Sequence, residues 1–269
     1  MIRLAPFLAL LLAGCAGGEA AERAAMRPTI VSLNPCSDAV LARVAAPGQL
    51  LAISHYSKDP SSSSMEPEEV ARFASTGGAV EEILALDPDI VVASTFIGPA
   101  TRAALEDLGM RVETFGAAAT VEESMEQVRQ LALLAGNEAA GERLADEIEE
   151  AMEAARSSAP PVEAALWQPG GIVPGEASLV SDLLRRTGFA SYGAARGMAQ
   201  ADYLSLEQIV SDPPEVLLVA GSEQGQSHPA LGGLPQMRRE DFDTRLIYCG
   251  GPTIIRAARR LAQIRQAAG

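Results

Sequence analysis

A segment of thirteen residues occurs twice in this chain, and the repeat constrains the fold more than any single motif. Residues 81–93 (EEILALDPDIVVA) return as residues 207–219 (EQIVSDPPEVLLV), at a constant offset of 126 residues. Each copy predicts the end of a helix, a turn at proline and a buried apolar strand, because proline cannot continue a helix and favours an extended residue before it. Two such units predict two similar lobes, and a cleft between lobes is a favoured site for small ligands.

Strands and helices alternate along the rest of the chain, which predicts parallel sheets. The expected fold is α/β, with two Rossmann-like lobes joined by one long rigid helix, since the run from Glu138 to Arg156 has no proline and keeps apolar residues on one face. The expected parts are a signal peptide (1–14), a tether (15–27), an N-terminal lobe (28–136), a connecting helix (137–158) and a C-terminal lobe (159–269). The strands are expected at 29–33, 50–54, 90–93, 111–115, 162–167, 216–219 and 246–249, and a short helix at 66–73.

The N-terminus is typical of an export signal. Arg3 precedes an apolar run of about ten residues, and small residues follow. The run is shorter than the roughly 20 residues that a membrane-spanning helix needs. The sequence LAGC ending at Cys15 is similar to a bacterial lipoprotein signal, in which the cysteine becomes the lipidated first residue. We therefore expect a periplasmic protein that is anchored to a membrane by lipid at Cys15.

Composition excludes some classes of partner. The formal net charge of -14 argues against nucleic acid, which binds basic surfaces. After Cys15, the remaining cysteines are Cys36 and Cys249. An oxidising compartment permits one disulfide between them, but the sequence does not show whether they meet.

Ligands of open parallel sheets bind beyond the carboxyl ends of the strands, and this rule selects the candidate site residues. They combine aromatic faces, glycines that permit close approach and a few polar groups, which suits a bulky, partly apolar ligand. The candidates are Asn34, Cys36, Ser37, His55, Tyr56, Thr95, Phe96, Trp167, Gly170, Gly171, Tyr203, Gln224, His228 and Gly250.

Several of these residues have plainer explanations. Trp167 is as well suited to core packing as to ligand stacking. The two cysteines could join His55 and His228 in a site for a soft metal, but their spacing contains no local chelate motif, so we predict no metal and no cofactor. Sequence signatures of serine hydrolases, zinc proteases and phosphate-binding loops are absent from the chain. The protein is therefore expected not to be an enzyme; the alternative is an exported cysteine-dependent enzyme that uses Cys36 or Cys249.

The Asn-Pro-Cys-Ser segment at 34–37, the His-Tyr-Ser segment at 55–57, the repeat and the long mid-chain helix together resemble the helical-backbone substrate-binding proteins of ABC importers. The similarity covers residues 28–268 and is greatest with the cobalamin-binding and ferric-siderophore-binding members. This resemblance implies a monomer that captures a corrinoid or an iron chelate, such as a siderophore or heme, and delivers it to an ABC permease and its ATPase. It also implies that Glu81 and Glu207, the first residues of the two repeats, dock on the permease.

Overall fold

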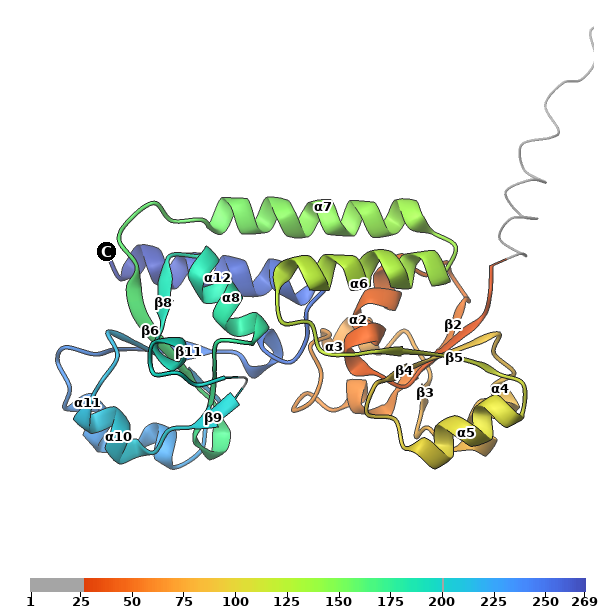
Figure 1. The fold of residues 1–269 in the computed structure, drawn as a ribbon, viewed down its shortest axis with the longest axis horizontal. Helices are drawn as coiled ribbons and strands as arrows, with labels where there is room; N and C mark the ends of the chain where they lie inside the picture. Colours follow the sequence, from red (N-terminus) through yellow and green to blue (C-terminus); the bar gives the residue numbers. More distant parts are fainter. Residues whose placement is uncertain (1–26, 200) are drawn as a thin grey trace, which may run out of the picture.

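The N-terminal lobe is built on a five-stranded parallel sheet. The computed structural model describes residues 27–199 and 201–269 (Figure 1). The strands lie in the order β3-β2-β1-β4-β5. Their bounds are β1 Ile30–Ser32, β2 Leu50–Ser54, β3 Ser75–Thr76, β4 Ile90–Ser94 and β5 Arg111–Phe115.

The C-terminal lobe contains a second parallel sheet, in the order β11-β10-β6-β8, and a small antiparallel pair, β7-β9. The bounds are β6 Val162–Trp167, β7 Ile172–Pro174, β8 Phe189–Ser191, β9 Ala201–Tyr203, β10 Val216–Ala220 and β11 Arg238–Phe242. Two lobes with parallel sheets confirm the predicted fold class.

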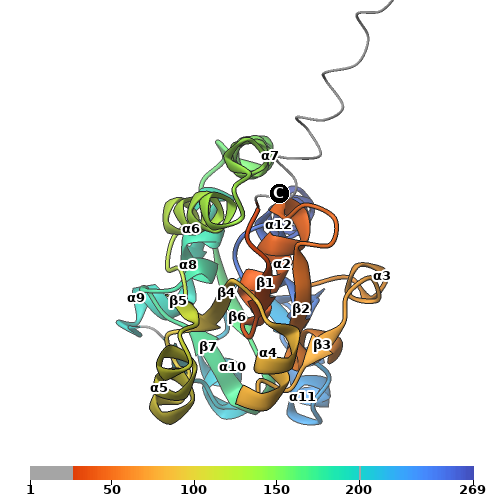
Figure 2. The same ribbon diagram turned by 90° about the vertical axis from the view of Figure 1, so that its right-hand side faces the viewer.

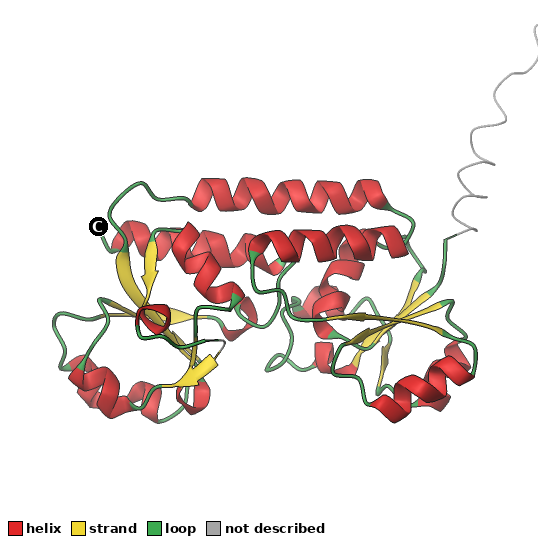
Figure 3. Ribbon diagram, in the orientation of Figure 1, coloured by secondary structure: helices red, strands yellow, loops and turns green. Residues whose placement is uncertain are grey.

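Helices cover both faces of each sheet (Figure 3). A long helix, α7 (Glu138–Ala155), lies across the junction of the two lobes on one side of the molecule and packs on α6 (Val121–Leu134) and α12 (Thr253–Ala267) (Figures 1 and 2). The other helices are α2 Pro35–Val44, α3 Pro67–Val70, α4 Val80–Leu86, α5 Pro99–Asp107, α8 Leu179–Arg186, α9 Tyr192–Ala195, α10 Leu206–Ser211 and α11 Pro229–Gly232. Short 3₁₀ turns are η1 His55–Lys58, η2 Pro169–Gly171, η3 Gly225–Ser227 and η4 Thr244–Leu246.

The alternation of side chains along the strands divides the core into layers. Ile30 and Val92 face the long helices, whereas the neighbouring residues Val31 and Val91 face α4 and α5. The layer beneath the long helices is one continuous cluster that also includes Leu166 and other residues of the C-terminal lobe. The two lobes therefore share a single apolar core on the side of α7.

Both copies of the repeat form the predicted helix, turn and strand, namely α4 to β4 and α10 to β10. The acid after each proline also has the same structural role. Asp89 Oδ2 accepts a hydrogen bond from the backbone N–H of Thr29 (2.7 Å), beside β1, and Glu215 Oε1 accepts one from the N–H of Glu163 (3.0 Å), in β6. Each copy thus fastens its strand to the neighbouring strand of its sheet.

Two sequence predictions of secondary structure are wrong. Residues 246–249 do not form a strand. The last strand of the lobe is β11 instead, and its charged sequence, RREDF, lies at the exposed edge of the sheet. The apolar character of residues 246–249 reflects packing at the junction of the lobes instead. The helix expected at 66–73 is shorter and covers Pro67–Val70.

The predicted signal peptide, Cys15 and most of the predicted tether lie outside the described residues. Within the described residues, no helix combines the length and the apolar character that a membrane span requires.

Candidate functional site

A cavity of about 330 Å³ lies between the two lobes. Its N-terminal wall follows the carboxyl ends of three strands, β1, β4 and β5, where the topology of parallel sheets places ligand sites. Its C-terminal wall comes from the start of α8 and from the segment before α12. The lining residues are 34, 36, 94, 96, 115–119 and 127 from the first lobe, and 177–180 and 247–250 from the second.

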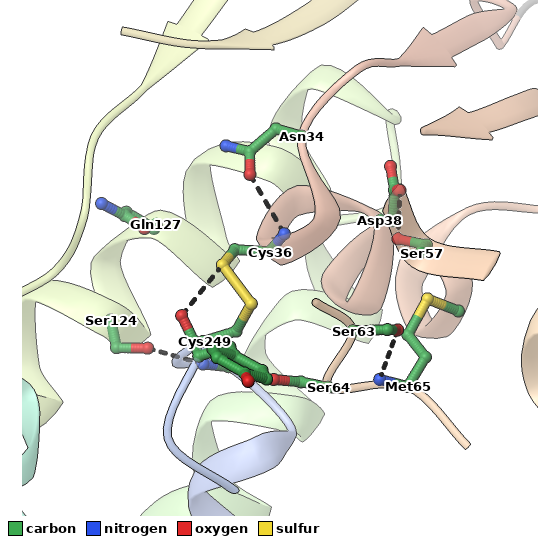
Figure 4. The surroundings of a disulfide bond; sticks show 12 residues. Asn34, Cys36, Asp38, Ser57, Ser63, Ser64, Met65, Ser124, Gln127 and Cys249 are labelled. Atoms are coloured by element: carbon green, nitrogen blue, oxygen red, sulfur yellow. Dashed lines mark hydrogen bonds between the residues drawn. A yellow bond between two sulfur atoms is a disulfide. The ribbon is translucent and has the colours of Figure 1, made fainter. Parts of the chain in front are cut away.

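A disulfide between Cys36 and Cys249 joins the lobes at this cavity (Figure 4). Cys36 lies in the first turn of α2, and Cys249 lies between η4 and α12, with their Cα atoms 5.1 Å apart. The bond closes a chain separation of 213 residues, and so large a loop makes a disulfide an effective restraint on the unfolded chain. The two cysteines left open by the sequence therefore pair with each other.

Gly250 and Gly251 let the C-terminal lobe approach α6 closely. The N–H of Gly251 donates to Ser124 Oγ at 2.7 Å. A Cβ atom on Gly250 would lie 2.2 Å from the same oxygen, so a larger residue would displace the Ser124 side chain from its bond with Gly251. This contact explains the need for glycine at position 250 on packing grounds alone.

Two amide side chains on the N-terminal wall are fixed by the backbone. Asn34 caps α2, and its Oδ1 accepts from the N–H of Cys36 at 3.0 Å. Gln127 on α6 donates through Nε2 to the carbonyl of Gly116 at 3.0 Å and so holds the loop after β5. In each side chain, one end of the amide bonds to the backbone. The other end, Nδ2 of Asn34 or Oε1 of Gln127, can contact a molecule in the cavity (Figure 4).

Four of the predicted residues line this cavity: Asn34, Cys36, Phe96 and Gly250. Phe96 is 89% exposed, so its ring is open to contact with a ligand at the edge of the cavity. Four other predicted residues line a separate hollow of about 300 Å³ on the C-terminal lobe: Trp167, Gly170, Gly171 and Tyr203. Trp167 is 4% exposed in the lobe's core and donates through Nε1 to the carbonyl of Leu204, so the core-packing explanation describes it here.

The remaining predicted residues do not line the interlobe cavity. Ser37 is buried within α2. His55 and Tyr56 stack on each other in η1 with ring centroids 4.0 Å apart. His228 accepts a hydrogen bond from the N–H of Ala230 and caps α11. Thr95 and Gln224 lie exposed on loops.

Sequence reasoning missed much of the wall. The small residues 116–119 follow a predicted strand end, so the strand-end rule could have found them, but they offer no reactive side chain. Tyr248 was concealed within the wrongly predicted strand. Residues 177–180 and Gln127 carry no local signal, because only the packing of the lobes brings them to the cavity.

The disulfide bears on both alternatives for the cysteines. Both sulfur atoms are bonded to each other, so neither is a free thiol nucleophile in this structure. The same bond removes the two thiolates from the proposed set of metal ligands, and the described residues contain no cluster of three or more potential ligands.

Comparison with known proteins agrees with this architecture. A family model described as periplasmic binding protein matches residues 30–243. The chain belongs to this family. Its fold is that of the helical-backbone substrate-binding proteins of ABC importers, with α7 as the helical backbone. A comparison with curated protein sequences found no match.

Solved structures with the same fold come from several bacteria. The heme-binding protein HutB of Vibrio cholerae has a TM-score of 0.72 and 16% identity, over 88% of this chain and 98% of that one. The vitamin B12-binding protein BtuF of Vibrio cholerae has a TM-score of 0.70 and 17% identity, over 89% and 97%. The heme-binding protein RhuT of Roseiflexus sp. RS-1 has a TM-score of 0.68 and 21% identity, over 90% and 98%.

A buried carboxyl group lies behind the wall of the cavity. Asp38, in the first turn of α2, accepts hydrogen bonds through Oδ2 from the N–H of Ser54 (2.9 Å) and from Ser57 Oγ (2.6 Å). These bonds hold η1 against α2 (Figure 4). Its Oδ1 has no partner within the described residues. Burial raises the pKa of Asp38 to about 7, although the nearby Ser32 hydroxyl and the bonds from Ser57 and Ser54 oppose the shift.

This pKa makes the contribution of Asp38 to stability depend on pH. Between about pH 4 and pH 7 the folded protein keeps a proton that the unfolded chain releases, so this contribution falls as the pH rises and is constant above pH 7. We predict that the unfolding free energy of the wild type, minus that of Asp38→Asn, falls by up to about 4 kcal/mol between pH 4 and pH 8. Urea unfolding across this range measures the difference, and a constant difference would contradict the assignment.

Proposed function

We propose that this protein captures a bulky metal chelate, either a corrinoid or an iron chelate such as heme or a ferric siderophore, and delivers it to an ABC permease driven by its ATPase. The observation that carries the proposal is the interlobe cavity, whose wall includes segments from both lobes and an 89% exposed phenylalanine, Phe96. Structural relatives whose names identify them as heme-binding and vitamin B12-binding proteins support it.

The proposed capture involves only a modest movement of the lobes. Their shared apolar core and the Cys36–Cys249 bond oppose wide opening, so the affinity depends on a largely preformed cavity. The protein acts as a monomer, because each chain contains both walls of the cavity.

Ligand capture can be tested by titration. Heme, a corrinoid and ferric siderophores are added separately to the purified protein, and binding is measured by calorimetry and by absorption of the chelate. We expect one chelate to bind per chain. Ala117→Trp, which fills the cavity, should abolish that binding, whereas Ala154→Trp on the exposed face of α7 should leave it unchanged. The absence of binding by every chelate would refute the proposal.

Two glutamates provide the proposed contacts with the permease. Glu81 and Glu207 are both exposed, and both occupy the second position of their helices, α4 and α10. The residues after them, Glu82 and Gln208, turn back and accept hydrogen bonds from the backbone N–H groups of Gly77 and Ser205. The following side chains thus support each helix start, while Glu81 and Glu207 remain available for arginines of a permease.

We predict that the double substitution Glu81→Ala and Glu207→Ala abolishes uptake of the ligand by cells and leaves ligand affinity unchanged, because neither residue lines the interlobe cavity. Uptake assays and calorimetry measure the two quantities. The control is Glu138→Ala with Glu149→Ala, two exposed glutamates on α7, which should transport normally. Normal uptake by the Glu81/Glu207 variant would disprove the docking role.

The proposed location is the periplasm, with a lipid anchor on Cys15. The apolar run before Cys15 and the LAGC sequence support this assignment. We predict that Cys15→Ser moves the protein from the membrane fraction to the soluble fraction of cells, as measured by fractionation and immunoblotting. An unchanged membrane association would rule out the anchor.

A further inference from the structure

The interlobe cavity is lined without any formally charged side chain. Among the described residues that form its wall, none is Asp, Glu, Lys, Arg or His. The apolar part of the wall includes Phe96, Leu179, Val180 and Ile247, and the loop at residues 116–119 adds only glycine and alanine.

Charged residues close to these segments in the chain make hydrogen bonds and ion pairs with other parts of the protein. Glu123 accepts from the N–H of Ala119 at 2.7 Å and so closes the start of α6. Asp182 accepts from the N–H of Val121 at 3.0 Å and pairs with Arg186 at 2.8 Å. Glu176, next to residues 177–180, pairs with Arg185 at 2.7 Å. Arg185 and Arg186 are thus paired with carboxylates, and the described lining residues include no cation that could pair with an anionic ligand.

The polar side chains of the wall are neutral: the hydroxyl groups of Ser94, Ser178 and Tyr248, and two amides. Asn34 commits Oδ1 to the N–H of Cys36, and no hydrogen bond from the described residues engages its Nδ2. Gln127 commits Nε2 to the carbonyl of Gly116, and its Oε1 is likewise not engaged. The wall thus offers one amide donor group and one amide acceptor group (Asn34 and Gln127, Figure 4), which are complementary in kind to the carbonyl and N–H groups of another amide.

An anionic ligand meets two penalties at such a wall. A carboxylate or catecholate that loses water there finds no positive partner to replace its hydration. The net charge of -14 adds a repulsive field around the whole protein. A neutral carboxamide or hydroxamate loses less hydration and can recover it through the two amides.

We propose that this cavity selects metal chelates whose periphery is uncharged, carrying carboxamides or hydroxamates, over chelates that carry free carboxylates or catecholates. The inference rests on the proposed function and narrows its ligand. An amide-bearing corrinoid and a neutral ferric trihydroxamate are the two sources of this chemistry, and separate arms of the test distinguish them.

The test uses two matched pairs of probes on the full protein. The first pair is dicyanocobinamide and dicyanocobyrinic acid, which share the corrin ring but carry amides and carboxylates respectively. The second pair is a cyclic neutral ferric trihydroxamate and a ferric tricatecholate. We expect the uncharged member of at least one pair to bind, and its anionic counterpart to bind at least about tenfold more weakly. The pair that shows this difference identifies the source.

A charge introduced at the wall provides the second measurement. Ala117→Arg should strengthen binding of the anionic member of that pair at least about tenfold, whereas Ala117→Gln, similar in reach and neutral, should not. Equal or tighter binding of the anionic probes by the wild type would overturn the inference and leave the proposed function intact. Failure of all four probes, and of heme, would overturn both.

Discussion

The arrangement of the two lobes depends on one apolar core that they share. The cluster beneath α2, α6, α7 and α12 continues from Ile30 of the first sheet to Leu166 of the second, so the lobes cannot separate on that side without exposing it to water. The Cys36–Cys249 bond fastens the same junction at the cavity. The lobes are therefore held together at this junction, next to the cavity that lies between them.

Ion pairs and a hydrogen bond across the junction orient the two lobes relative to each other. Arg245 pairs with Glu66 at 2.7 Å, and Arg256 contacts the same carboxylate, so residues from η4 and α12 meet the segment before α3. The N–H of Gly251 donates to Ser124 on α6. Because these groups are directional, they fix the angle between the lobes, which an apolar core alone would leave less defined. The same contacts therefore set the position of one cavity wall relative to the other.

Much of the fold could be predicted because each step relied on local signals. The repeats gave the strands β4 and β10, and the proline-free run gave α7 to within a residue of its ends. The edge strand β11 was missed because an exposed edge needs no apolar pattern, and its sequence is RREDF. The strand-end rule selected Asn34, Cys36 and Phe96, which line the interlobe cavity, but it also selected His228, whose imidazole caps a helix away from it.

The sequence by itself determined the two lobes, the parallel sheets, the repeat glutamates Glu81 and Glu207, and the family resemblance. These features could be predicted because apolar periodicity and helix-ending prolines are signals that act over a few neighbouring residues. Only the tertiary structure decided which side chains share a cavity. Cys36 meets Cys249 across 213 residues, and Gln127 and Tyr248 reach the same cavity from opposite lobes. The neutral character of the cavity lining is a property of the assembled surface, because the acidic composition of the chain gives no sign of it until packing places the charged residues away from the cavity.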